Sequence, residues 1–482
     1  MCFQYRNMIG RKKEQERINR LLDSTRSEFL AVTGRRRVGK TFLIDSMLGA
    51  HYCFSITGIQ NGNMETQLIN FGIKLAEYSG TLRPQKPDNW QMAFLQLKHY
   101  IKSLDREKKK VIFIDELPWV ATPKSGFIQM LAHFWNDYLS KEPHFILVIC
   151  GSATSWISQK VINDPGGLHN RITENIHLYP FTLAETNAFL KDRGLRFSFQ
   201  ETAKIYMTLG GIPFYLEHIR KGESFATAIE RLCFSPTGIL FNEYNNLFQA
   251  LFSNAQMHLQ IVAILANRHY GMPHAAILKQ LGMKQPTGSY KRAMDELLIS
   301  DFIMENPSFG KKKRGATFRL IDEFSIFYHR FLQPNRKYTP GIWQQLSESQ
   351  GYKVWAGYAF ETLCLKHIEA IKQALGIPAV YTEINSLSMN ASEDQPGFQI
   401  DLLIDRKDHA INLCEIKFHS GPITINKETY EKLIALRQHF LDYSRTRKQV
   451  FLTLITNFGI TPNEYAKEVV DAEVKLEQLF KN

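Results

Sequence analysis

The segment that most constrains this chain is AVTGRRRVGKTFL, which occupies residues 31–43. It contains Gly34, four further residues, and then Gly39, Lys40 and Thr41 in succession. This is the G-x-x-x-x-G-K-[ST] pattern of a loop whose backbone amides surround phosphate groups. The pattern predicts a nucleotide-binding domain if a strand precedes the loop and a helix follows it.

The residues on either side of the loop meet that requirement. Residues 27–34 are a short apolar run that enters the first glycine, and residues 40–50 have the spacing of a helix. Strand, loop and helix in this order direct the loop amides and the helix N-terminus at the β- and γ-phosphates. We expect ATP as the cofactor, with Lys40 neutralising phosphate charge and Thr41 ligating Mg²⁺.

Three consecutive arginines fill the middle of this loop, at Arg35, Arg36 and Arg37. A backbone cradle requires no particular side chain there, provided that the side chains turn outward. Two interpretations remain open. In one, a guanidinium, which we assign to Arg37, reaches a phosphate or an acidic partner in a lid. In the other, the three side chains point to solvent or pair with surface carboxylates.

Two further apolar runs end in polar residues. Residues 108–117 end in Asp115 and Glu116, which predicts that Asp115 holds Mg²⁺ through water and that Glu116 polarises the attacking water. The alternative is a solvated acidic pair. Residues 144–157 pass through Ser152, which can sense the γ-phosphate. Three apolar strands separated by helical segments indicate an α/β fold with a parallel sheet and flanking helices.

Composition sets wider limits on the chain. Its 482 residues exceed what one hydrophobic core organises, so several domains are expected. There are 59 Lys and Arg against 47 Asp and Glu, a net charge of +12, which favours an acidic partner such as nucleic acid or serves solubility. Six cysteines form no C-x-x-C pair, so neither a zinc site nor a disulfide framework is indicated. Without a secretory signal or a long apolar stretch, we expect a cytoplasmic protein and no membrane partner.

The middle of the chain has the pattern of a winged helix. Helices are predicted at residues 256–269 and 272–283, and residues 286–306 are predicted to be helical through Leu298 and then extended. Residues 308–322 have the pattern of a hairpin with a basic tip. The third helix and the wing tip would contact DNA. The residues concerned are Ser289, Tyr290, Lys291 and Arg292 on the helix, and Lys311, Lys312, Lys313 and Arg314 on the wing. The alternative is a packing module between domains with a solvated hairpin tip.

The last third of the chain contains a second group of chemically active residue types. A predicted helix at 352–375 and two predicted hairpin strands carry Glu361, Asp401, Glu415 and Lys417. Glu415 and Lys417 are two residues apart on one strand, so they share a face. Carboxylates in this arrangement can ligate Mg²⁺, and the lysine can orient or activate water. The alternative is an exposed acid and lysine on an edge strand.

Several ordered motifs over residues 5–235 resemble the archaeal-type ATPase family of the AAA+/STAND group. They are NMIGRKKEQERINRLL, TGRRRVGKTFLI, VIFIDELPW, ILVICGSATSWI, RITENIHLYPFT and LGGIPFYL. The resemblance implies that Ile9, Gly10 and Arg11 pack near the adenine, and that the segment ending at Pro213 marks a helical lid. It also implies that Arg171 completes the site of a neighbouring subunit in a homo-oligomer. The alternative is a structural arginine.

The C-terminal group resembles the PD-(D/E)xK nuclease-like domain that is fused to many such ATPases. The resemblance implies metal ligation by Glu361, Asp401 and Glu415, and catalysis by Asp401, Glu415 and Lys417. Ile400 stands where that motif has proline. Inactive versions of the fold serve as binding domains, so cleavage and binding remain alternatives.

We therefore expect four domains. They are a P-loop ATPase core (1–180), a helical lid (181–250), a winged helix with a linker (251–335) and a restriction-endonuclease-like α/β domain (336–482). The expected function is ATP-dependent action on nucleic acid, in the first place DNA, with a metal-dependent nuclease domain. The alternative is a STAND-like signalling ATPase whose C-terminal domain is a non-catalytic protein-interaction module.

Overall fold

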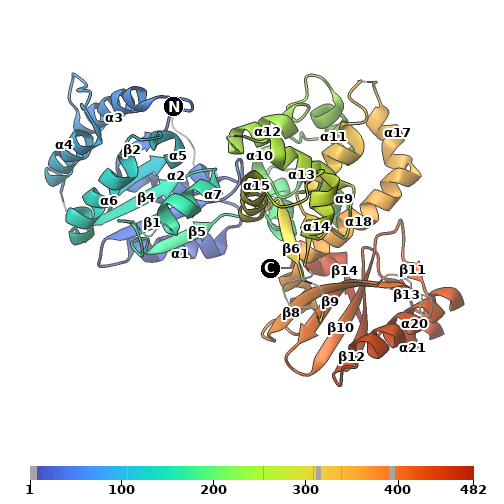
Figure 1. Ribbon diagram of the computed structural model, residues 1–482. Helices are drawn as coiled ribbons and strands as arrows, with labels where there is room; N and C mark the ends of the chain where they lie inside the picture. Colours follow the sequence, from blue (N-terminus) through green and yellow to red (C-terminus); the bar gives the residue numbers. More distant parts are fainter. Residues whose placement is uncertain are drawn as a thin grey trace. The chain divides into compact units, whose positions relative to one another are not determined.

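The computed structural model divides into two compact units, Met1–Pro180 and Phe181–Asn482 (Figure 1). The sequence places the end of the ATPase core at the same residue, but the three further predicted segments lie in one unit. The predicted wing tip, Lys311 to Arg314, lies outside the described residues. The structure describes residues 8–105, 107–163, 166–252, 254–307, 309–310, 316–337, 339–389 and 397–481, with only the backbone for 388 and 389.

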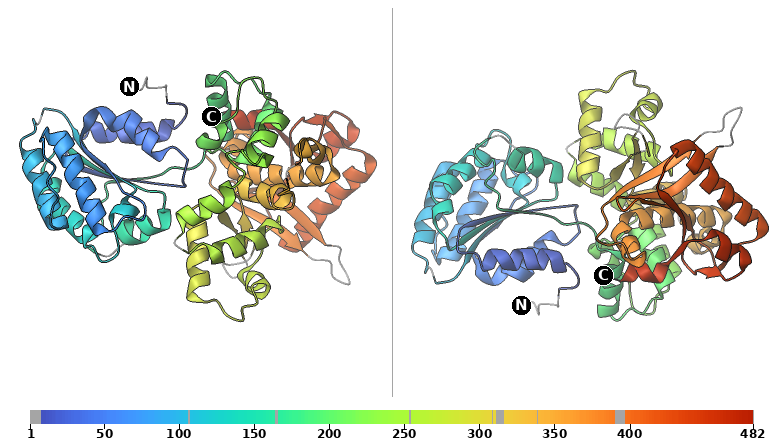
Figure 2. Two further views of the ribbon diagram at one scale, coloured as in Figure 1. Left: turned by 90° about the horizontal axis from the view of Figure 1, so that it is seen from above. Right: turned by 90° about the horizontal axis from the view of Figure 1, so that it is seen from below.

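The first unit is a five-stranded sheet with helices on both faces (Figure 2). The strand order is β2-β3-β4-β1-β5, and every neighbouring pair is parallel, which confirms the predicted parallel sheet. β1 and β4 are buried along their whole length, which explains their uninterrupted apolar sequences. The strands are β1 (Glu28–Thr33), β2 (Tyr52–Thr57), β3 (Lys110–Asp115), β4 (Phe145–Cys150) and β5 (Glu174–His177).

An aromatic cluster joins α3, α4 and α6 to one face of this sheet. Phe94 of α4 and Phe134 of α6 stack within it, with ring centroids 5.0 Å apart. Asn63 and Asn89 cap α3 and α4, because each side chain accepts a hydrogen bond from the backbone three residues later. The helices are α1 (Lys12–Leu22), α2 (Lys40–Leu48), α3 (Met64–Ser79), α4 (Trp90–Lys102), α5 (Leu117–Val120), α6 (Phe127–Asp137) and α7 (Thr154–Ile157), with short turns η1 (Gly49–His51), η2 (Leu139–Lys141) and η3 (Ser158–Ile162).

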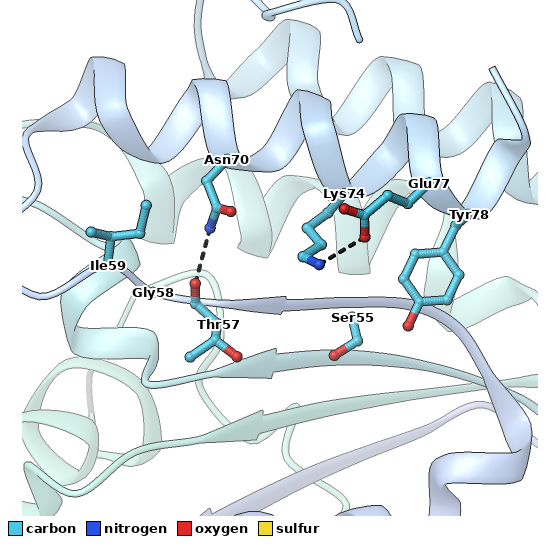
Figure 3. A pocket seen from close by; sticks show the side chains of 8 residues that line it. All are labelled: Ser55, Thr57, Gly58, Ile59, Asn70, Lys74, Glu77 and Tyr78. Atoms are coloured by element: carbon cyan, nitrogen blue, oxygen red, sulfur yellow. Dashed lines mark hydrogen bonds and ion pairs between the residues drawn. The ribbon is translucent and has the colours of Figure 1, made fainter. Parts of the chain in front are cut away.

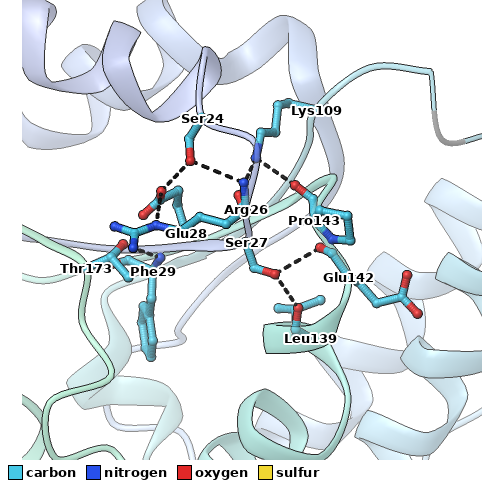
Figure 4. A network of polar contacts seen from close by, with 10 residues as sticks. All are labelled: Ser24, Arg26, Ser27, Glu28, Phe29, Lys109, Leu139, Glu142, Pro143 and Thr173. Atoms are coloured by element: carbon cyan, nitrogen blue, oxygen red, sulfur yellow. Dashed lines mark hydrogen bonds and ion pairs between the residues drawn. The ribbon is translucent and has the colours of Figure 1, made fainter.

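A polar network fixes the beginning of β1 (Figure 4). Ser27 Oγ donates to the backbone carbonyl of Leu139 at 2.9 Å. The Glu28 carboxylate accepts from Ser24 Oγ at 2.5 Å and from Arg26 Nε at 3.0 Å. Burial acts to raise the pKa of Glu28, but these hydrogen bonds outweigh it and hold the pKa below its usual value. The strand that carries the phosphate loop at one end is therefore anchored at the other.

The second unit begins with a group of short helices. Thr182 and Ser198 start α8 and α9 as capping boxes with Glu185 and Glu201, so both helix starts are specified by local sequence. The elements are α8 (Leu183–Asp192), α9 (Phe199–Leu209), α10 (Pro213–Leu216), α11 (Phe225–Ile229), η4 (Glu230–Phe234) and α12 (Glu243–Leu251).

Three helices and a two-stranded hairpin follow. They are α13 (Gln256–Ala266), α14 (His274–Gln280), α15 (Gly288–Ile299), β6 (Ile303–Asn306) and β7 (Thr317–Leu320). β6 and β7 pair antiparallel, and Met272 bridges to Phe318. The predicted extended stretch that ends at residue 306 is confirmed as β6. The prediction of a hairpin within 308–322 is wrong in its first strand, because β6 is the strand that pairs with β7. The next elements are α16 (Glu323–Phe327), η5 (Tyr328–Leu332) and α17 (Ile342–Glu348).

A second five-stranded sheet occupies the end of the chain, in the order β14-β12-β10-β9-β8. β8, β9 and β10 form an antiparallel series, whereas β12 and β14 continue the sheet in parallel. The strands are β8 (Thr382–Met389), β9 (Phe398–Arg406), β10 (Ala410–Lys417), β12 (Gln449–Thr456) and β14 (Ala472–Lys475). The other elements are α18 (Gln350–Lys366), α19 (Ile368–Ala374), α20 (Lys427–Ser444), α21 (Glu464–Val469), η6 (Leu476–Phe480) and the small pair β11 (Ile423–Thr424) and β13 (Ile460–Thr461).

The prediction of one helix over residues 352–375 is wrong, because α18 ends at Lys366 and α19 begins at Ile368. His367 lies between them with backbone angles of −113° and 32°, outside the helical region. Its ring is held on both sides: Leu183 N donates to Nε2 at 2.8 Å, and Nδ1 contacts the Leu363 carbonyl at 2.8 Å. A tertiary contact with α8 therefore accompanies the break.

Candidate functional site

Two glycines give the phosphate loop its shape. Gly34 leaves β1 with a φ of 134°, and a Cβ there would lie 2.3 Å from the carbonyl oxygen of Leu178. Gly39 has a φ of 92° and immediately precedes α2. Side chains rarely adopt either backbone conformation, so the two invariant positions of the pattern coincide with two positions that require glycine.

The reactive side chains gather at the carboxyl ends of β1 and β3. The Lys40 ammonium is 6% exposed and donates to the carbonyl oxygens of Gly34 at 2.9 Å and Arg35 at 2.8 Å. Thr41 Oγ1 donates to Asp115 Oδ2 at 3.1 Å. The phosphate loop and the acidic strand end, which are 74 residues apart in sequence, therefore meet through these two side chains.

Glu116 is fixed by the next strand. Ser152, just beyond β4, donates to Glu116 Oε2 from both its backbone N and its Oγ, each at 3.1 Å. Glu116 N in turn donates to Asp115 Oδ1 at 2.9 Å. β4 lies between β1 and β3, so its polar end reaches the acid pair directly. Sequence analysis predicted both residues for this site but missed their contact.

These residues fit Mg²⁺ bound largely through water and nucleotide. The Thr41 hydroxyl and the Asp115 carboxylate are hard oxygen donors placed 3.1 Å apart. Mg²⁺ usually keeps several water ligands and takes one or two protein ligands together with phosphate oxygens, which suits so small a donor set.

The loop arginines do not all behave as surface residues. Arg35 is only 3% exposed, so this side chain does not point to solvent. Pairing of the loop arginines with carboxylates stays a prediction. Arg36 and Arg37 are half-buried, and Arg37 has a φ of 72°. Arg11, which is also buried, donates from Nη2 to the Val38 carbonyl at 3.1 Å. The leading segment is thereby tied to the phosphate loop, a contact that sequence analysis did not foresee.

The remaining predicted nucleotide contacts stay predictions. Ile9 and Gly10 are half-buried and immediately precede Arg11. Pro213 is the first residue of α10 and belongs to the second unit. Arg171 is exposed and precedes β5. This segment lies beside the start of β1, as the hydrogen bond from Thr173 N to the Phe29 carbonyl at 2.9 Å indicates.

A separate cavity of about 490 Å³ lies between β2 and α3 (Figure 3). Asn70 Nδ2 donates to the Thr57 carbonyl in it at 3.0 Å, and Lys74 pairs with Glu77 at 2.7 Å. None of the residues that line it belongs to a predicted site. Lys74 of this cavity is already paired with Glu77, so it adds no free positive charge to the phosphate site.

In the second unit, Glu361 of α18 meets a residue that sequence analysis missed. Arg319 of β7 places Nη2 3.6 Å from Glu361 Oε2, and both side chains are buried. Burial, followed by the charge of Asp401, raises the pKa of Glu361 to about 8. A single arginine inside the apolar strand TFRL was the available sequence signal.

The other C-terminal residues are also engaged. Asp401 accepts from Ile416 N at 3.1 Å and from Gln399 Nε2 at 3.2 Å. Glu415 pairs with Lys417 at 2.5 Å. Burial and the Asp401 carboxylate raise the pKa of Glu415. Burial acts to lower the pKa of Lys417, but the neighbouring carboxylates outweigh burial, so the pKa of Lys417 is raised.

These residues do not fit a divalent cation as they stand. Among the described residues, no group of three or more His, Cys, Asp or Glu side chains is arranged to hold a metal ion. The prediction that Glu361, Asp401 and Glu415 form a ligand set is therefore not met by this arrangement. Arg319 and Lys417 supply the positive charge that faces these acids.

The start of α15 presents basic residues to solvent. Lys291 and Arg292 are exposed, as is Ser289. Tyr290 was predicted to contact DNA with them, but it is 1% exposed and its hydroxyl lies 2.7 Å from His274 Nδ1. The prediction is wrong for Tyr290, because the helix turns this ring into the core between α14 and α15.

The five described cysteines, at 53, 150, 233, 364 and 414, are free and buried. Within the described ranges, no helix is both long enough and apolar enough to cross a bilayer.

Comparisons with known proteins agree with the geometry of the first unit. Residues 8–219 match a family described as an ATPase domain predominantly from Archaea. An uncharacterised protein of Methanocaldococcus jannaschii, MJECL04, is 22% identical over 442 residues, which are 89% of this chain and 94% of that protein.

A solved structure shows a similar fold. The Walker-type ATPase PABY2304 of Pyrococcus abyssi is similar with a TM-score of 0.51 and 18% identity, over 67% of this chain and 96% of that one. The ORC2 protein of Aeropyrum pernix, solved as ADPNP–ADP complexes, has a TM-score of 0.41 and 14% identity, over 71% of this chain and 97% of that one.

Proposed function

We propose that this chain, a P-loop ATPase through residues 8–219, couples ATP hydrolysis to the binding of nucleic acid, in the first place DNA. The observation that carries the ATPase assignment is the hydrogen-bonded series from Thr41 through Asp115 and Glu116 to Ser152. It joins the ends of three strands at one point beside the phosphate loop.

Each side chain has a defined task in the reaction. Lys40 exchanges the carbonyl oxygens of Gly34 and Arg35 for phosphate oxygens of ATP. Thr41 and Asp115 hold Mg²⁺, which neutralises phosphate charge when it is bound. Glu116 orients and polarises the water that attacks the γ-phosphate, and Ser152 sets the direction of that carboxylate.

Arg171 acts on a second copy of the chain. It precedes β5 at the amino end of the sheet, whereas the phosphate loop follows β1 at the carboxyl end. A six-residue strand spans about 20 Å, beyond the reach of an arginine side chain. An arginine supplied by a neighbour stabilises charge on the transferred phosphoryl group. We therefore include a homo-oligomer in the proposal.

Nucleic acid is bound by the exposed start of α15. Lys291 and Arg292 lie there, and Lys284, seven residues before Lys291 in the sequence, is also exposed. The net charge of +12 supports contact with phosphates, and such contacts carry no sequence information by themselves.

A salt titration tests this interface. Lys291→Ser with Arg292→Ser should weaken duplex binding, measured by fluorescence anisotropy, and lower the slope of log K against log salt by about 0.9 for each phosphate contact removed. A matched control replaces two exposed lysines elsewhere in the unit, Lys467→Ser with Lys481→Ser. Equal losses in both double variants would mean that charge alone, and not α15, drives binding.

A second question is whether the C-terminal domain is a nuclease or a non-catalytic binding module. Helix α18, the antiparallel β8–β10 series, α20 and the parallel β12 occur in an order that supports the nuclease-like resemblance. The pairing of Glu361 with Arg319 instead favours the non-catalytic candidate, a binding module. A nicking assay on plasmid DNA with Mg²⁺ or Mn²⁺ separates them. We expect no cutting by the wild type; cutting that Asp401→Ala abolishes would restore the nuclease assignment.

A further inference from the structure

Arg319 of the β6–β7 hairpin directs its side chain at helix α18. Its guanidinium is 4% exposed, donates to Thr362 Oγ1 at 2.9 Å, and lies 3.6 Å from the Glu361 carboxylate. Thr362 and Glu361 are neighbours on α18, so the arginine connects β7 to that helix. A buried guanidinium requires such compensation, because desolvating an unpaired charge is very unfavourable.

The hairpin that carries Arg319 is also attached to the C-terminal sheet. Asn306 Nδ2 donates to Ser386 Oγ at 2.7 Å. Phe309 N donates to the Ser386 carbonyl at 3.2 Å, and the Phe309 ring packs against Phe440 with centroids 5.3 Å apart. Asn306 of β6 and Phe309 therefore lie against the edge strand β8, which holds the hairpin in place.

A small cavity lies beside Arg319. His269 stacks on Tyr358 with centroids 3.6 Å apart and planes within 8°. The cavity lined by these rings, Arg319 and Thr362 measures about 20 Å³. That is room for about one water molecule, and Glu361, Asp401 and Glu415 do not line this cavity.

We propose that the Arg319 guanidinium supplies positive charge to the C-terminal acidic cluster, defined as Glu361, Asp401 and Glu415. While the β6–β7 hairpin is docked, this guanidinium excludes a divalent cation from the cluster. The proposal stands on the contacts of Arg319 and the hairpin, and it does not depend on ATP hydrolysis or on nucleic-acid binding. It accounts for carboxylates gathered on α18, β9 and β10 without a preformed ligand set.

Direct Mn²⁺ binding tests the proposal. Titrations followed by the loss of the free Mn²⁺ electron paramagnetic resonance signal use the full chain without nucleotide, in an Asp115→Asn background that removes the carboxylate assigned to Mg²⁺ in the ATP site. Arg319→Met keeps much of the side-chain length and removes the charge. We expect this variant to bind one Mn²⁺ at least about tenfold more tightly than the parent, and adding Asp401→Asn should abolish that binding. Arg319→Lys should bind like the parent.

A second variant guards against misfolding of Arg319→Met. Asn306→Ala with Phe309→Ala loosens the hairpin from outside and leaves Arg319 intact. The same Asp401-dependent Mn²⁺ binding should appear, while circular dichroism stays unchanged. The proposal is overturned if the parent already binds Mn²⁺ through Asp401, or if neither folded variant gains binding.

Discussion

At the residue scale, the contact between Ser152 and Glu116 is the feature most open to experiment. The Glu116 carboxylate accepts two hydrogen bonds from one serine, and its own backbone has a φ of 45°. An acid on a left-handed turn at a strand end needs such support to keep one direction. We infer that Ser152 positions Glu116 and does not itself bind the nucleotide tightly.

Ser152→Ala should therefore lower kcat for ATP hydrolysis more than it changes the nucleotide Kd. The loss of one hydrogen bond to a charged group costs about 1.5–3 kcal/mol, which corresponds to a fall in kcat of roughly tenfold or more. Ser152→Thr keeps the hydroxyl and should retain most of the rate. Stopped-flow binding and phosphate-release assays measure the two quantities separately. An unchanged kcat in Ser152→Ala would show that the contact has no role in turnover.

Residues of the phosphate site could be predicted because their pattern is local. Gly34, Gly39, Lys40 and Thr41 lie within eight residues of one another, and the loop geometry demands glycine at two of them. Arg319 could not be predicted as a partner of the C-terminal acids. Its contact with α18 depends on how a hairpin and a helix pack, and nothing in the spacing of the acids encodes that.

At the element scale, His367 joins three helices and makes their stability depend on pH. Leu183 N–H must donate to Nε2, so the ring is neutral with its proton on Nδ1, which donates to the Leu363 carbonyl. Burial lowers the pKa of His367 to about 4, from an ordinary value of 6.5. Between these values the unfolded chain binds a proton that the folded chain does not. The free energy of unfolding therefore falls as pH falls from 6.5 to about 4.

His367→Gln should flatten this dependence, because a neutral amide can both donate and accept. The shift corresponds to roughly 3 kcal/mol at most, so the thermal midpoint of the wild type should fall visibly over this range. Thermal unfolding followed by circular dichroism between pH 4 and pH 7 measures it. His133→Gln, at an exposed position of the first unit, is the matched control. Parallel pH profiles for the wild type and His367→Gln would contradict the assignment.

The helices and strands differ in how far their limits follow from local sequence. β1 and β4 are predicted by uninterrupted apolar runs, and α8 and α9 by their capping boxes. β6 was predicted as an extended stretch but not as the first strand of the hairpin, because its four residues, Ile303–Asn306, closely follow the helical pattern of α15. Their strand character comes from pairing with β7, and that partner lies more than ten residues away.

At the scale of the whole molecule, the role proposed for Arg171 makes ATP hydrolysis depend on whether chains assemble. Arg171→Ala keeps an intact phosphate loop, whereas Lys40→Ala keeps an intact Arg171. Each variant alone should hydrolyse ATP at least about tenfold more slowly than the wild type. Mixing them should restore part of the rate, because one subunit supplies the loop and the other the arginine. A mixture no faster than its components, or full activity in Arg171→Ala alone, would contradict action between subunits.

The most direct test of the central claim is steady-state ATP hydrolysis by the full chain with Mg²⁺, in the presence and absence of duplex DNA. The account predicts hydrolysis by the wild type that DNA stimulates. Glu116→Gln should bind nucleotide like the wild type. Its rate of hydrolysis should fall about 100-fold or more, because the group that polarises water is gone. Lys40→Ala should lose nucleotide affinity by at least about tenfold. A wild-type rate in Glu116→Gln, or equal nucleotide affinity in Lys40→Ala, would contradict the site; a wild-type rate that DNA leaves unchanged would contradict its coupling to nucleic acid.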